Sequence, residues 1–442
     1  MLKNSQLQKV AGWKSDVRPS TLRPEAMIDL RGWHTPVPLT HPAASLLNAK
    51  AVRRHCEEIM AYVAQGDSPY FVWQETRMPA IAAYVAEVIR ERYPDLNVPY
   101  HSRWRHFEAG GVDRWKLLVE EYELSGSDQN EERARSRIDL VIPSVLLDAG
   151  AGSNWRYHDK ASGQTLARSE GLGVASLALF ASGAMSANAF TPLRSDASAL
   201  MRIRSQHLAQ TFQVDASNPL VGIDARAALL ARLGEIADAT PAVFGRPARL
   251  GNLYDYLKSH AVDNRIEAEF ILITLLRALG PMWPARLTLQ GVPLGDCWPH
   301  PAVSGGRVPF HKLTQWLTYS LLEPLNDAGL QVIGLDQLTG LPEYRNGGLL
   351  LDLGAIEARD PTFHSRLLRV NEPAVVEWRA LTVVALDRLA DLVRGTLGLK
   401  VTSFPLACVL EGGTWAAGRK IAAQQRPGGA PPVNVDSDGT VF

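Results

Sequence analysis

Apolar residues recur three and four positions apart in several stretches of the chain, the spacing that puts them on one face of a helix. The longest such stretch covers residues 372–394 and has Pro373 in its first turn, where the missing N–H is not needed. Shorter stretches with the same spacing cover residues 50–64, 79–92 and 223–237. The pattern predicts a helix in each of these four ranges.

Other stretches have a weaker or an ambiguous pattern. Residues 115–124, 198–213 and 265–279 favour helices, and the last of these is apolar enough for a core helix. Residues 139–145 form a short apolar run that fits either a buried helix or a strand, whereas 287–294 favours a short pair of strands. With about ten to twelve helical patterns and few strands, the sequence predicts a mainly α protein.

The chain shows no internal repeat and no break in composition that would mark a linker. Its 442 residues can bury one large core, so we expect a single mainly helical domain over residues 48–424. Residues 1–47 are Pro-rich and irregular and carry Trp13 and Trp33, which predicts an arm that packs on the body. Residues 425–442 lack periodicity and are expected to be a tail that is mobile unless it docks.

The stretch from Arg307 to Gly354 contains the most informative polar residues. Its first half predicts an amphipathic helix with Pro309 in the first turn, and Pro324 ends this helix or kinks it close to its end. The apolar face carries Phe310, Leu313, Leu317, Ser320 and Leu321, and a separate polar stripe carries Lys312, Gln315 and Tyr319.

A carboxylate, a phenol and a guanidinium follow one another at Glu343, Tyr344 and Arg345, between Pro342 and a glycine pair. The proline restricts the backbone and the glycines relax it, so we expect a turn that aims these polar groups. Beside the lysine and glutamine of the preceding helix, this turn can grip an anionic sugar and place a carboxylate on it. The alternative is a surface ion pair between Glu343 and Arg345, beside a solvated lysine.

Charge balance and cysteine content narrow the class of protein. Forty-six Lys and Arg balance 46 Asp and Glu, so no overall field attracts nucleic acid or an anionic membrane. Cys56, Cys297 and Cys408 are far apart and odd in number, which favours a reducing compartment over a disulfide framework. The first residues lack the apolar run of a signal peptide, and no apolar run reaches the ~18 residues of a membrane span. We therefore expect a cytoplasmic protein with no nucleic-acid or membrane partner.

The sequence lacks the strong motifs of phosphate-binding loops, zinc proteases and nucleophile elbows. Cys297, His300 and His311 have a spacing that suits zinc, but a metal site needs more ligands than this segment supplies. The alternative is a buried thiol with hydrogen-bonded imidazoles. We expect neither a metal nor another cofactor.

A second group of polar residues surrounds a glycine pair between residues 101 and 114. Its cations can hold a phosphate, or they can form an internal ion-pair network with Glu108 and Asp113. These cations are Arg103, Arg105, His106 and Arg114.

Trp155, Tyr157 and Trp415 occur in Gly-rich segments that we interpret as turns rather than helix faces. Aromatic side chains in such places either stack on a planar group or a sugar, or plug the surface of the protein. Both interpretations remain open from the residues alone.

Seven segments of the chain resemble one known family. They are F-E-A-G-G-V-D-R, G-A-G-S-N-W-R-Y, R-S-E-G-L, V-P-F-H-K-L-T-Q-W-L-T-Y-S-L, G-L-P-E-Y-R-N-G-G-L, E-W-R-A-L-T-V and L-E-G-G-T-W-A-A-G-R. With the closing S-D-G-T-V-F, they resemble the uracil-catabolism protein four family of fungi and bacteria, from about residue 20 to the end. That family belongs to a pyrimidine-degradation route in which uracil becomes a nucleotide, its ring is opened and a ribosylurea species is split.

The chain is more distantly similar to the queuosine salvage proteins, N-glycosyl hydrolases of a nucleoside 5′-phosphate whose helical fold is like that of DNA glycosylases. Their Lys-Arg-Ala-Gln segment matches Lys312 to Gln315, and their Ala-Asp-Tyr-Arg segment matches Pro342 to Arg345. The resemblance implies that Glu343 takes the place of the catalytic aspartate and that Lys312 binds phosphate. Leu313 replaces a cation of that family, so part of the phosphate grip must come from elsewhere.

The resemblance implies an N-glycosyl hydrolase of a ribosylurea or related ribonucleoside 5′-phosphate, in which Glu343 assists the attack of water. The residues expected to bind substrate are Lys312, Gln315, Tyr344, Arg345, Arg103, Arg105, His106, Trp155, Tyr157, Trp415 and Arg419. One alternative is a non-catalytic protein that binds a nucleotide or a partner of the same pathway. Another is a metal-dependent hydrolase of a urea-type amide, and a homo-oligomer is compatible with all three.

Overall fold

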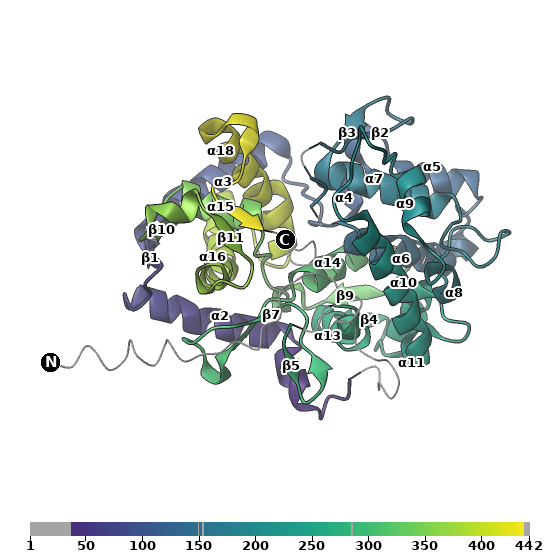
Figure 1. Ribbon diagram of the computed structural model, residues 1–442, viewed down its shortest axis with the longest axis horizontal. Coiled ribbons are helices and arrows are strands. Elements are labelled where there is room, and N and C mark those ends of the chain that lie inside the picture. The colour runs from purple at the N-terminus through teal and green to yellow at the C-terminus, as the bar shows by residue number, and fades with distance from the viewer. Residues whose placement is uncertain (1–36, 149, 153, 284–285, 437–442) are drawn as a thin grey trace.

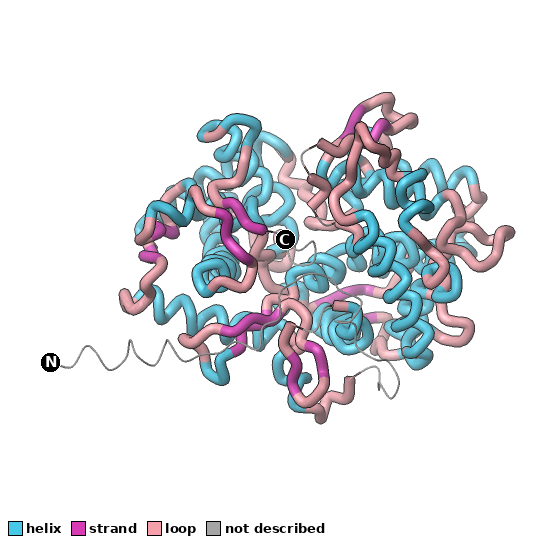
Figure 2. Tube along the Cα trace, in the orientation of Figure 1, coloured by secondary structure: helices cyan, strands magenta, loops and turns pink. Residues whose placement is uncertain are grey.

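The computed structural model describes residues 37–148, 150–152, 154–283 and 286–436. Helices dominate it, and its strands are short (Figures 1 and 2). One continuous cluster of buried apolar side chains extends from Val37 to Val433. The prediction of a single, mainly α domain is therefore confirmed.

Eleven longer helices extend over most of the described chain. Their bounds are α2 (Ala49–Ala64), α3 (Met78–Arg92), α5 (Arg114–Glu121), α6 (Asn130–Leu146), α7 (Arg168–Ala181), α10 (Ile223–Ala239), α13 (Ala268–Leu279), α14 (Lys312–Asp327), α15 (Tyr344–Asp352), α16 (Pro373–Leu397) and α18 (Trp415–Gln425). Among them α7, α15 and α18 were not predicted as helices. Shorter helices are α4 (Trp104–Phe107), α8 (Ala197–Leu200), α9 (Ser205–Thr211), α11 (Pro241–Phe244), α12 (Leu253–Ser259) and α17 (Leu406–Cys408). A π-helix, Val409–Thr414, joins α17 to α18.

Within the described ranges the strands form two-stranded sheets only. The antiparallel pairs are β1 (Phe71–Trp73) with β10 (Ile356–Ala358), β2 (Tyr157–His158) with β3 (Thr165–Leu166), β5 (Thr288–Leu289) with β6 (Val292–Pro293), and β7 (Cys297–Pro299) with β8 (Arg307–Pro309). The parallel pairs are β4 (Arg265–Glu267) with β9 (Gln331–Ile333), and β11 (Leu367–Arg369) with β12 (Asn434–Asp436).

Most of the predicted elements are present with shifted ends. The ambiguous run 139–145 lies inside α6, and the pair of strands in 287–294 is β5 and β6. The range 198–213 contains two helices, because extended backbone at Arg204 interrupts it. The range 265–279 begins as β4 and becomes helical only at Ala268.

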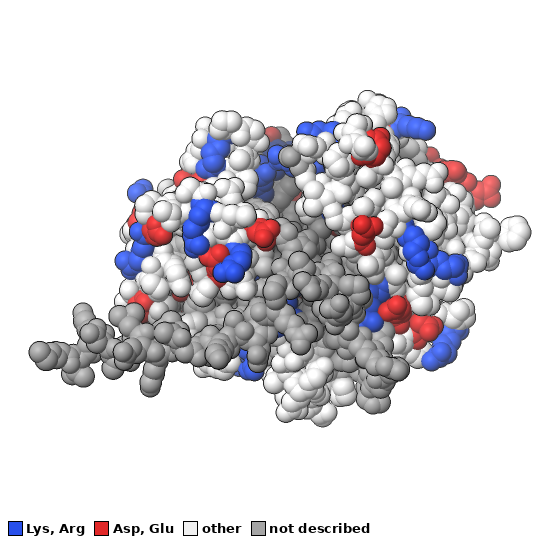
Figure 3. All heavy atoms as spheres, viewed as in Figure 1, with Lys and Arg blue, Asp and Glu red and all other residues white. Residues whose placement is uncertain are grey.

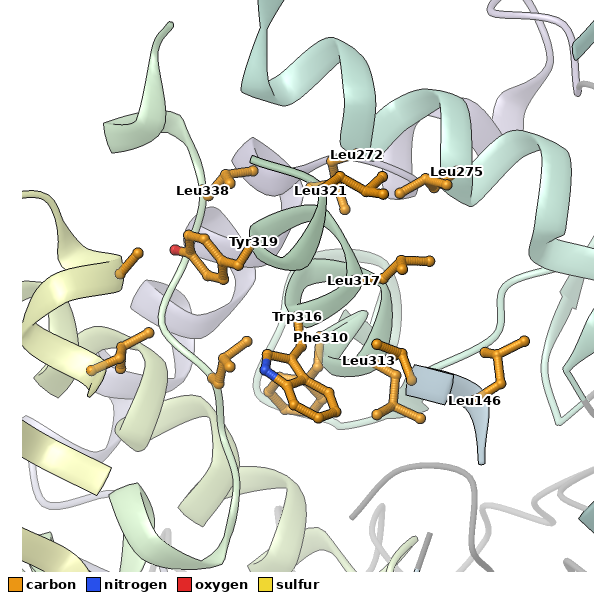
Figure 4. Close-up of a cluster of buried hydrophobic side chains, with 14 of the residues drawn as sticks. Leu146, Leu272, Leu275, Phe310, Leu313, Trp316, Leu317, Tyr319, Leu321 and Leu338 are labelled. Carbon is orange, nitrogen blue, oxygen red and sulfur yellow. The ribbon is translucent and has the colours of Figure 1, made fainter. Parts of the chain in front are cut away.

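Helix α14 lies at the centre of the molecule rather than on its surface. Its residues from Lys312 to Leu322 are all buried, including Gln315 and Tyr319 of the predicted polar stripe. Figure 4 shows apolar side chains of this helix on several sides, with Leu317 and Leu321 toward α13 and Tyr319 toward Leu338. The prediction of one apolar face was therefore too narrow.

The start of α14 is fixed by a buried ion pair rather than by Pro309. The carboxylate of Asp296 accepts the backbone N–H of Lys312 at 3.0 Å, and Arg379 of α16 donates to both carboxylate oxygens at 2.8 Å. His311 takes the left-handed conformation just before the helix (φ 52°), and Pro309 ends β8. Pro324 lies inside the helix, which continues to Asp327.

The segment that begins at Glu343 is a helix, not the expected turn. Glu343 is the N-cap of α15, and its side chain accepts the N–H groups of Arg345 and Asn346. The glycines that follow allow close packing: a Cβ on Gly347 would lie 2.8 Å from the ring of Trp378, and one on Gly348 would lie 3.0 Å from Pro432. The glycine pair is therefore required by helix packing, not by turn geometry.

The C-terminal segment docks on this helix. Arg345 donates to the carbonyl of Gly429 at 2.9 Å, Arg426 to Asp352 at 2.8 Å, and β12 extends the sheet of β11. At the other end, Val37 donates to the carbonyl of Arg277. Of the predicted arm, residues 1–36 with Trp13 and Trp33 lie outside the described residues, as do 437–442 of the tail.

Arg114 and Asp159 form a buried pair that ties α5 to the β2–β3 hairpin. Arg114 also donates to three backbone carbonyls, and Asp159 accepts from both the N–H and the hydroxyl of Ser162. Burial alone would raise the pKa of Asp159, but the hydrogen bonds from Arg114 and Ser162 outweigh it and lower this pKa to about 2. The pair therefore stabilises the fold only while the carboxyl is ionised.

The Asp159→Asn variant is expected to lose roughly 2 kcal/mol of unfolding free energy at pH 7. The folded pKa of Asp159 lies below its unfolded value of about 4. The difference in unfolding free energy between the two proteins therefore has its full size above pH 4 and shrinks as the pH falls toward 2. Urea unfolding of both proteins between pH 7 and pH 3 measures it, with the exposed Asp67→Asn as control. A difference independent of pH would contradict the prediction.

Candidate active site

Glu343 and Lys312 line one cavity of about 430 Å³. Its wall residues come from α4 and α7, from α15 and α18, and from α14, which lies between these two groups in Figure 1. In Figure 3 the upper outline of the molecule is notched between the two groups, and blue Lys or Arg atoms lie near this notch. The walls consist of His101, His106, Asp148, Gly150, Ala151, Gly152, Arg168, Ser169, Glu170, Lys312, Trp316, Leu341, Glu343, Tyr344, Arg345, Trp415, Arg419 and Pro431.

The carboxylate of Glu343 is held in a fixed position. One oxygen accepts the N–H of Arg345 at 2.8 Å, and the other accepts that of Asn346 at 2.6 Å. Each carboxylate oxygen can accept more than one hydrogen bond, so these two contacts leave capacity for water or substrate. Glu343 is therefore both a helix cap and a preoriented acceptor in the cavity wall.

The loop that carries Glu343 is anchored to α14. Gln315 donates from its amide to the hydroxyl of Thr339 at 2.9 Å, and the Tyr319 hydroxyl donates to the carbonyl of Thr339, also at 2.9 Å. Gln315 is thus completely buried and does not line the cavity. We correct its expected role: it supports the loop before Glu343 rather than contacting a ligand.

Lys312 supplies a cation at the first position of α14. Its side chain is 8% exposed, and burial lowers the pKa of its ammonium group, while the nearby Glu343 carboxylate opposes this shift. Placing a lysine at a helix N-terminus is electrostatically unfavourable. An anion in the cavity would offset both the cost of burying the charged ammonium group and this unfavourable interaction with the helix N-terminus.

Further cations enter the cavity from α15, α18 and the start of α7. Arg345 is half-buried, and burial lowers the pKa of its guanidinium. Arg419 donates to Glu170 at 2.7 Å and lies 4.8 Å above the ring of Trp415. Arg168 has a left-handed backbone (φ 52°) directly at the start of α7. Together with Lys312, these arginines make the walls suitable for an anionic ligand.

The predicted basic cluster divides between the cavity and the interior. His106 lines the cavity, whereas Arg105 pairs with Glu323 at 2.8 Å and lies outside it. Arg103 is wholly buried behind the wall, where it contacts Asp148 at 2.9 Å and donates to Ser144 at 2.8 Å. These two arginines and Arg114 do form internal ion pairs, but mainly with Asp148, Glu323 and Asp159. Of the expected partners, Glu108 lies 3.2 Å from Arg105, whereas Asp113 caps α5.

Of Trp155, Tyr157 and Trp415, only Trp415 lines the cavity, and it begins α18 rather than lying in a turn. Trp155 is fully buried and donates to the carbonyl of Phe212 at 2.9 Å. Tyr157 belongs to β2 and packs against Trp155. Both are structural core residues in this arrangement, so we correct the expectation that they cover a ligand.

Several wall residues were not among the sequence candidates. Arg168 and Glu170 belong to the segment R-S-E-G-L, and Asp148 lies two residues before G-A-G-S-N-W-R-Y, but none of the three was assigned a role. Trp316 was missed because it lies between the expected apolar and polar faces of α14. Burial alone would raise the pKa of Asp148, but the Arg103 guanidinium outweighs it and lowers this pKa, so the Asp148 carboxylate in the wall is ionised.

The metal alternative gains no geometric support in the described ranges. No group of three or more His, Cys, Asp or Glu side chains suited to a metal occurs there. His311 bonds to the carbonyl of Leu46 at 2.8 Å, His300 lies 3.2 Å from Glu377, and Cys297 is buried. This arrangement matches the alternative of a buried thiol with hydrogen-bonded imidazoles.

The fold and the site define a mainly helical protein whose cavity combines a fixed carboxylate, several cations and aromatic rings. Residues 45–442 match the family described as "Protein of unknown function (DUF1688)", so the chain belongs to that family. No described helix has the length and apolarity needed to cross a membrane.

Two relatives match over most of their length. "Protein urg3" of Schizosaccharomyces pombe is 38% identical over 410 residues, which cover 91% of this chain and 100% of that protein. "Uracil catabolism protein 4" of Lachancea kluyveri is 35% identical over 439 residues, which cover 91% of this chain and 99% of that protein. The resemblance to the uracil-catabolism protein four family is thereby confirmed.

Proposed function

We propose that this protein acts in uracil catabolism by hydrolysing the N-glycosidic bond of a ribosylurea or related pyrimidine-derived ribonucleoside 5′-phosphate. The pathway is suggested by the name of the relative from Lachancea kluyveri. The reaction type is supported by one observation above all: the fixed carboxylate of Glu343 and the buried cation of Lys312 line the same cavity.

Hydrolysis of such a bond passes through a positively charged, oxocarbenium-like sugar. In the proposed reaction Glu343 stabilises this charge and accepts a proton from the water that attacks C1′. The backbone N–H groups of Arg345 and Asn346 orient the carboxylate before substrate arrives, so little reorganisation is needed. Asp148 and Glu170 add negative charge to the wall, which favours the same cationic state.

The cations hold the phosphate in this proposal. Lys312, Arg345, Arg419 and Arg168 line the cavity. The three arginines take over the role of the cationic residue that the queuosine salvage proteins have at the position of Leu313. A volume of about 430 Å³ falls in the range of small-molecule sites. Binding energy from the phosphate is then used to position C1′ beside the carboxylate.

Incubation with ribosylurea 5′-phosphate tests the proposal directly. We expect urea and ribose 5-phosphate to appear in equal amounts, with kcat/KM at least about 100-fold lower for unphosphorylated ribosylurea, because the cations then lose their anion. Urea can be measured by a coupled assay and ribose 5-phosphate by chromatography. Unchanged substrate after prolonged incubation would exclude this reaction.

A non-catalytic binding role is the second candidate, and one observation favours it. Both oxygens of Glu343 already cap α15, which is a sufficient structural reason for a glutamate at this position. A binding protein would show a ligand-dependent rise in Tm with ribosylurea 5′-phosphate but no release of urea. The assay above therefore separates the two candidates.

A further inference from the structure

Aromatic rings line the part of the cavity between α4, α14 and α18. The rings of His106 and Trp316 lie perpendicular, with centroids 5.7 Å apart, and those of His106 and Trp415 lie at the same angle, 6.5 Å apart. His101 adds a fourth ring, 6.4 Å from Trp316 and 6.0 Å from Trp415. Such a group of rings can pack against a planar ligand group.

Two ring nitrogens of this group have no hydrogen-bond partner among the described residues. They are Nδ1 of His106 and Nε1 of Trp316, in side chains that are 7% and 5% exposed. Buried polar atoms in folded proteins almost always have partners, so a ligand in the cavity can supply those that these two wall nitrogens lack. His101 differs, because its Nδ1 is paired with Glu411 at 2.8 Å.

His106 is neutral at physiological pH and is therefore not a phosphate-binding cation. Burial lowers its pKa to about 4, assisted by Arg103 and His101 and opposed by Asp148 and Glu170. A neutral imidazole can still donate one N–H. The N–H of Trp316 can only donate, so its partner must be an acceptor.

We infer that His106, Trp316 and Trp415 form the leaving-group subsite for a planar group that carries a carbonyl oxygen next to the glycosidic nitrogen, such as a ureide or another amide. This inference rests on the proposed function and assigns His106 and Trp316 as donors to that oxygen. As the C1′–N bond breaks, its electron pair moves to nitrogen and is delocalised onto the oxygen, where the two N–H groups stabilise it. Water supplies the hydroxyl at C1′, Glu343 takes the proton, and solvent returns a proton to the leaving nitrogen.

Close packing of α7 against α4 holds His106 in place. A Cβ on Gly173 would lie 2.8 Å from the Cβ of His106 and 3.5 Å from the guanidinium carbon of Arg103. A side chain at this position would force the imidazole to move. Gly173 is therefore a positioning residue for the subsite.

Two substrates with the same ribose 5-phosphate but different leaving groups test the assignment. Ribosylurea 5′-phosphate needs stabilisation of its leaving group, whereas 4-nitrophenyl riboside 5-phosphate does not. His106→Phe and Trp316→Phe keep a ring and remove the nitrogen. Each is expected to lower kcat on the ureide by about 100-fold or more, and on the nitrophenyl compound by less than about fivefold. His106→Asn keeps an N–H near the position of Nδ1, so its kcat on the ureide is expected to be at least about tenfold higher than that of His106→Phe.

The outcomes separate this inference from the proposed function. Equal losses on both substrates, or no loss on either, would overturn the leaving-group assignment while leaving hydrolysis intact. Cleavage of neither substrate by the unmodified protein would overturn the proposed function and the assignment with it. His260→Phe, in an exposed ring that packs on Tyr256 outside the cavity, is the matched control and is expected to change neither rate.

Discussion

Replacing Glu343 by Gln is expected to lower kcat on ribosylurea 5′-phosphate by about 10²- to 10⁴-fold, with substrate affinity nearly unchanged. The amide keeps the size of the side chain but can neither accept the proton of the attacking water nor balance the charge on the sugar. Single-turnover kinetics gives the rate of the chemical step, and titration calorimetry with the inactive variant gives the affinity. Near-normal turnover would remove Glu343 from the mechanism.

The capping role of Glu343 requires a matched control. Weakening an N-cap typically costs about 1 kcal/mol, which can reduce activity simply by loosening α15. Asp113 caps α5 by accepting the N–H of Lys116 at 3.0 Å and does not line the cavity, so Asp113→Asn makes the same chemical change elsewhere. Comparable loss of stability in both variants, with loss of kcat only in Glu343→Gln, would assign the effect to chemistry.

Replacing Arg379 by Met is expected to destabilise the protein by about 3–5 kcal/mol. The change leaves the carboxylate of Asp296 buried without its bidentate partner, next to the first N–H of α14. The Arg379 side chain is 1% exposed and that of Asp296 is 11% exposed, so water compensates little. Urea unfolding at pH 7, followed by tryptophan fluorescence, measures the loss.

The double variant Asp296→Asn with Arg379→Met distinguishes a lost ion pair from lost packing. An asparagine oxygen can still accept the N–H of Lys312, but it carries no charge that needs a partner. The double variant is therefore expected to be more stable than Arg379→Met alone by at least about 1 kcal/mol. If it is no more stable, packing of the guanidinium on Phe310, at 4.1 Å, is the larger contribution.

Regular amphipathic patterns located the helices whose one face is apolar, such as α2, α3 and α10. The pattern also located α14 and α16 but did not show that their polar residues Gln315 and Arg379 are buried, because these side chains pair with other buried groups instead of facing water. It failed at α15 and α18, whose glycines suggested turns. Gly418 permits α18 to contact the backbone of Arg345, so these glycines allow two helices to pack closely.

The sequence also predicted the candidate site only in part, because burial again depends on tertiary packing. Glu343, Lys312, Tyr344, Arg345, His106, Trp415 and Arg419 all line the cavity. The motifs identified the segments, but which side of a segment faces the cavity depends on tertiary packing. Trp155 and Trp415 looked equivalent in sequence, yet one is in the core and the other in the wall. Asp148 was missed because its guanidinium partner, Arg103, comes from a segment far away in the sequence.

The cavity draws its walls from stretches as distant as His101 and Pro431. No short contiguous fragment therefore contains all the wall residues, so the site cannot be transferred to another protein as one inserted segment. Engineering of a new specificity has to proceed by single exchanges at wall positions, within a scaffold kept whole.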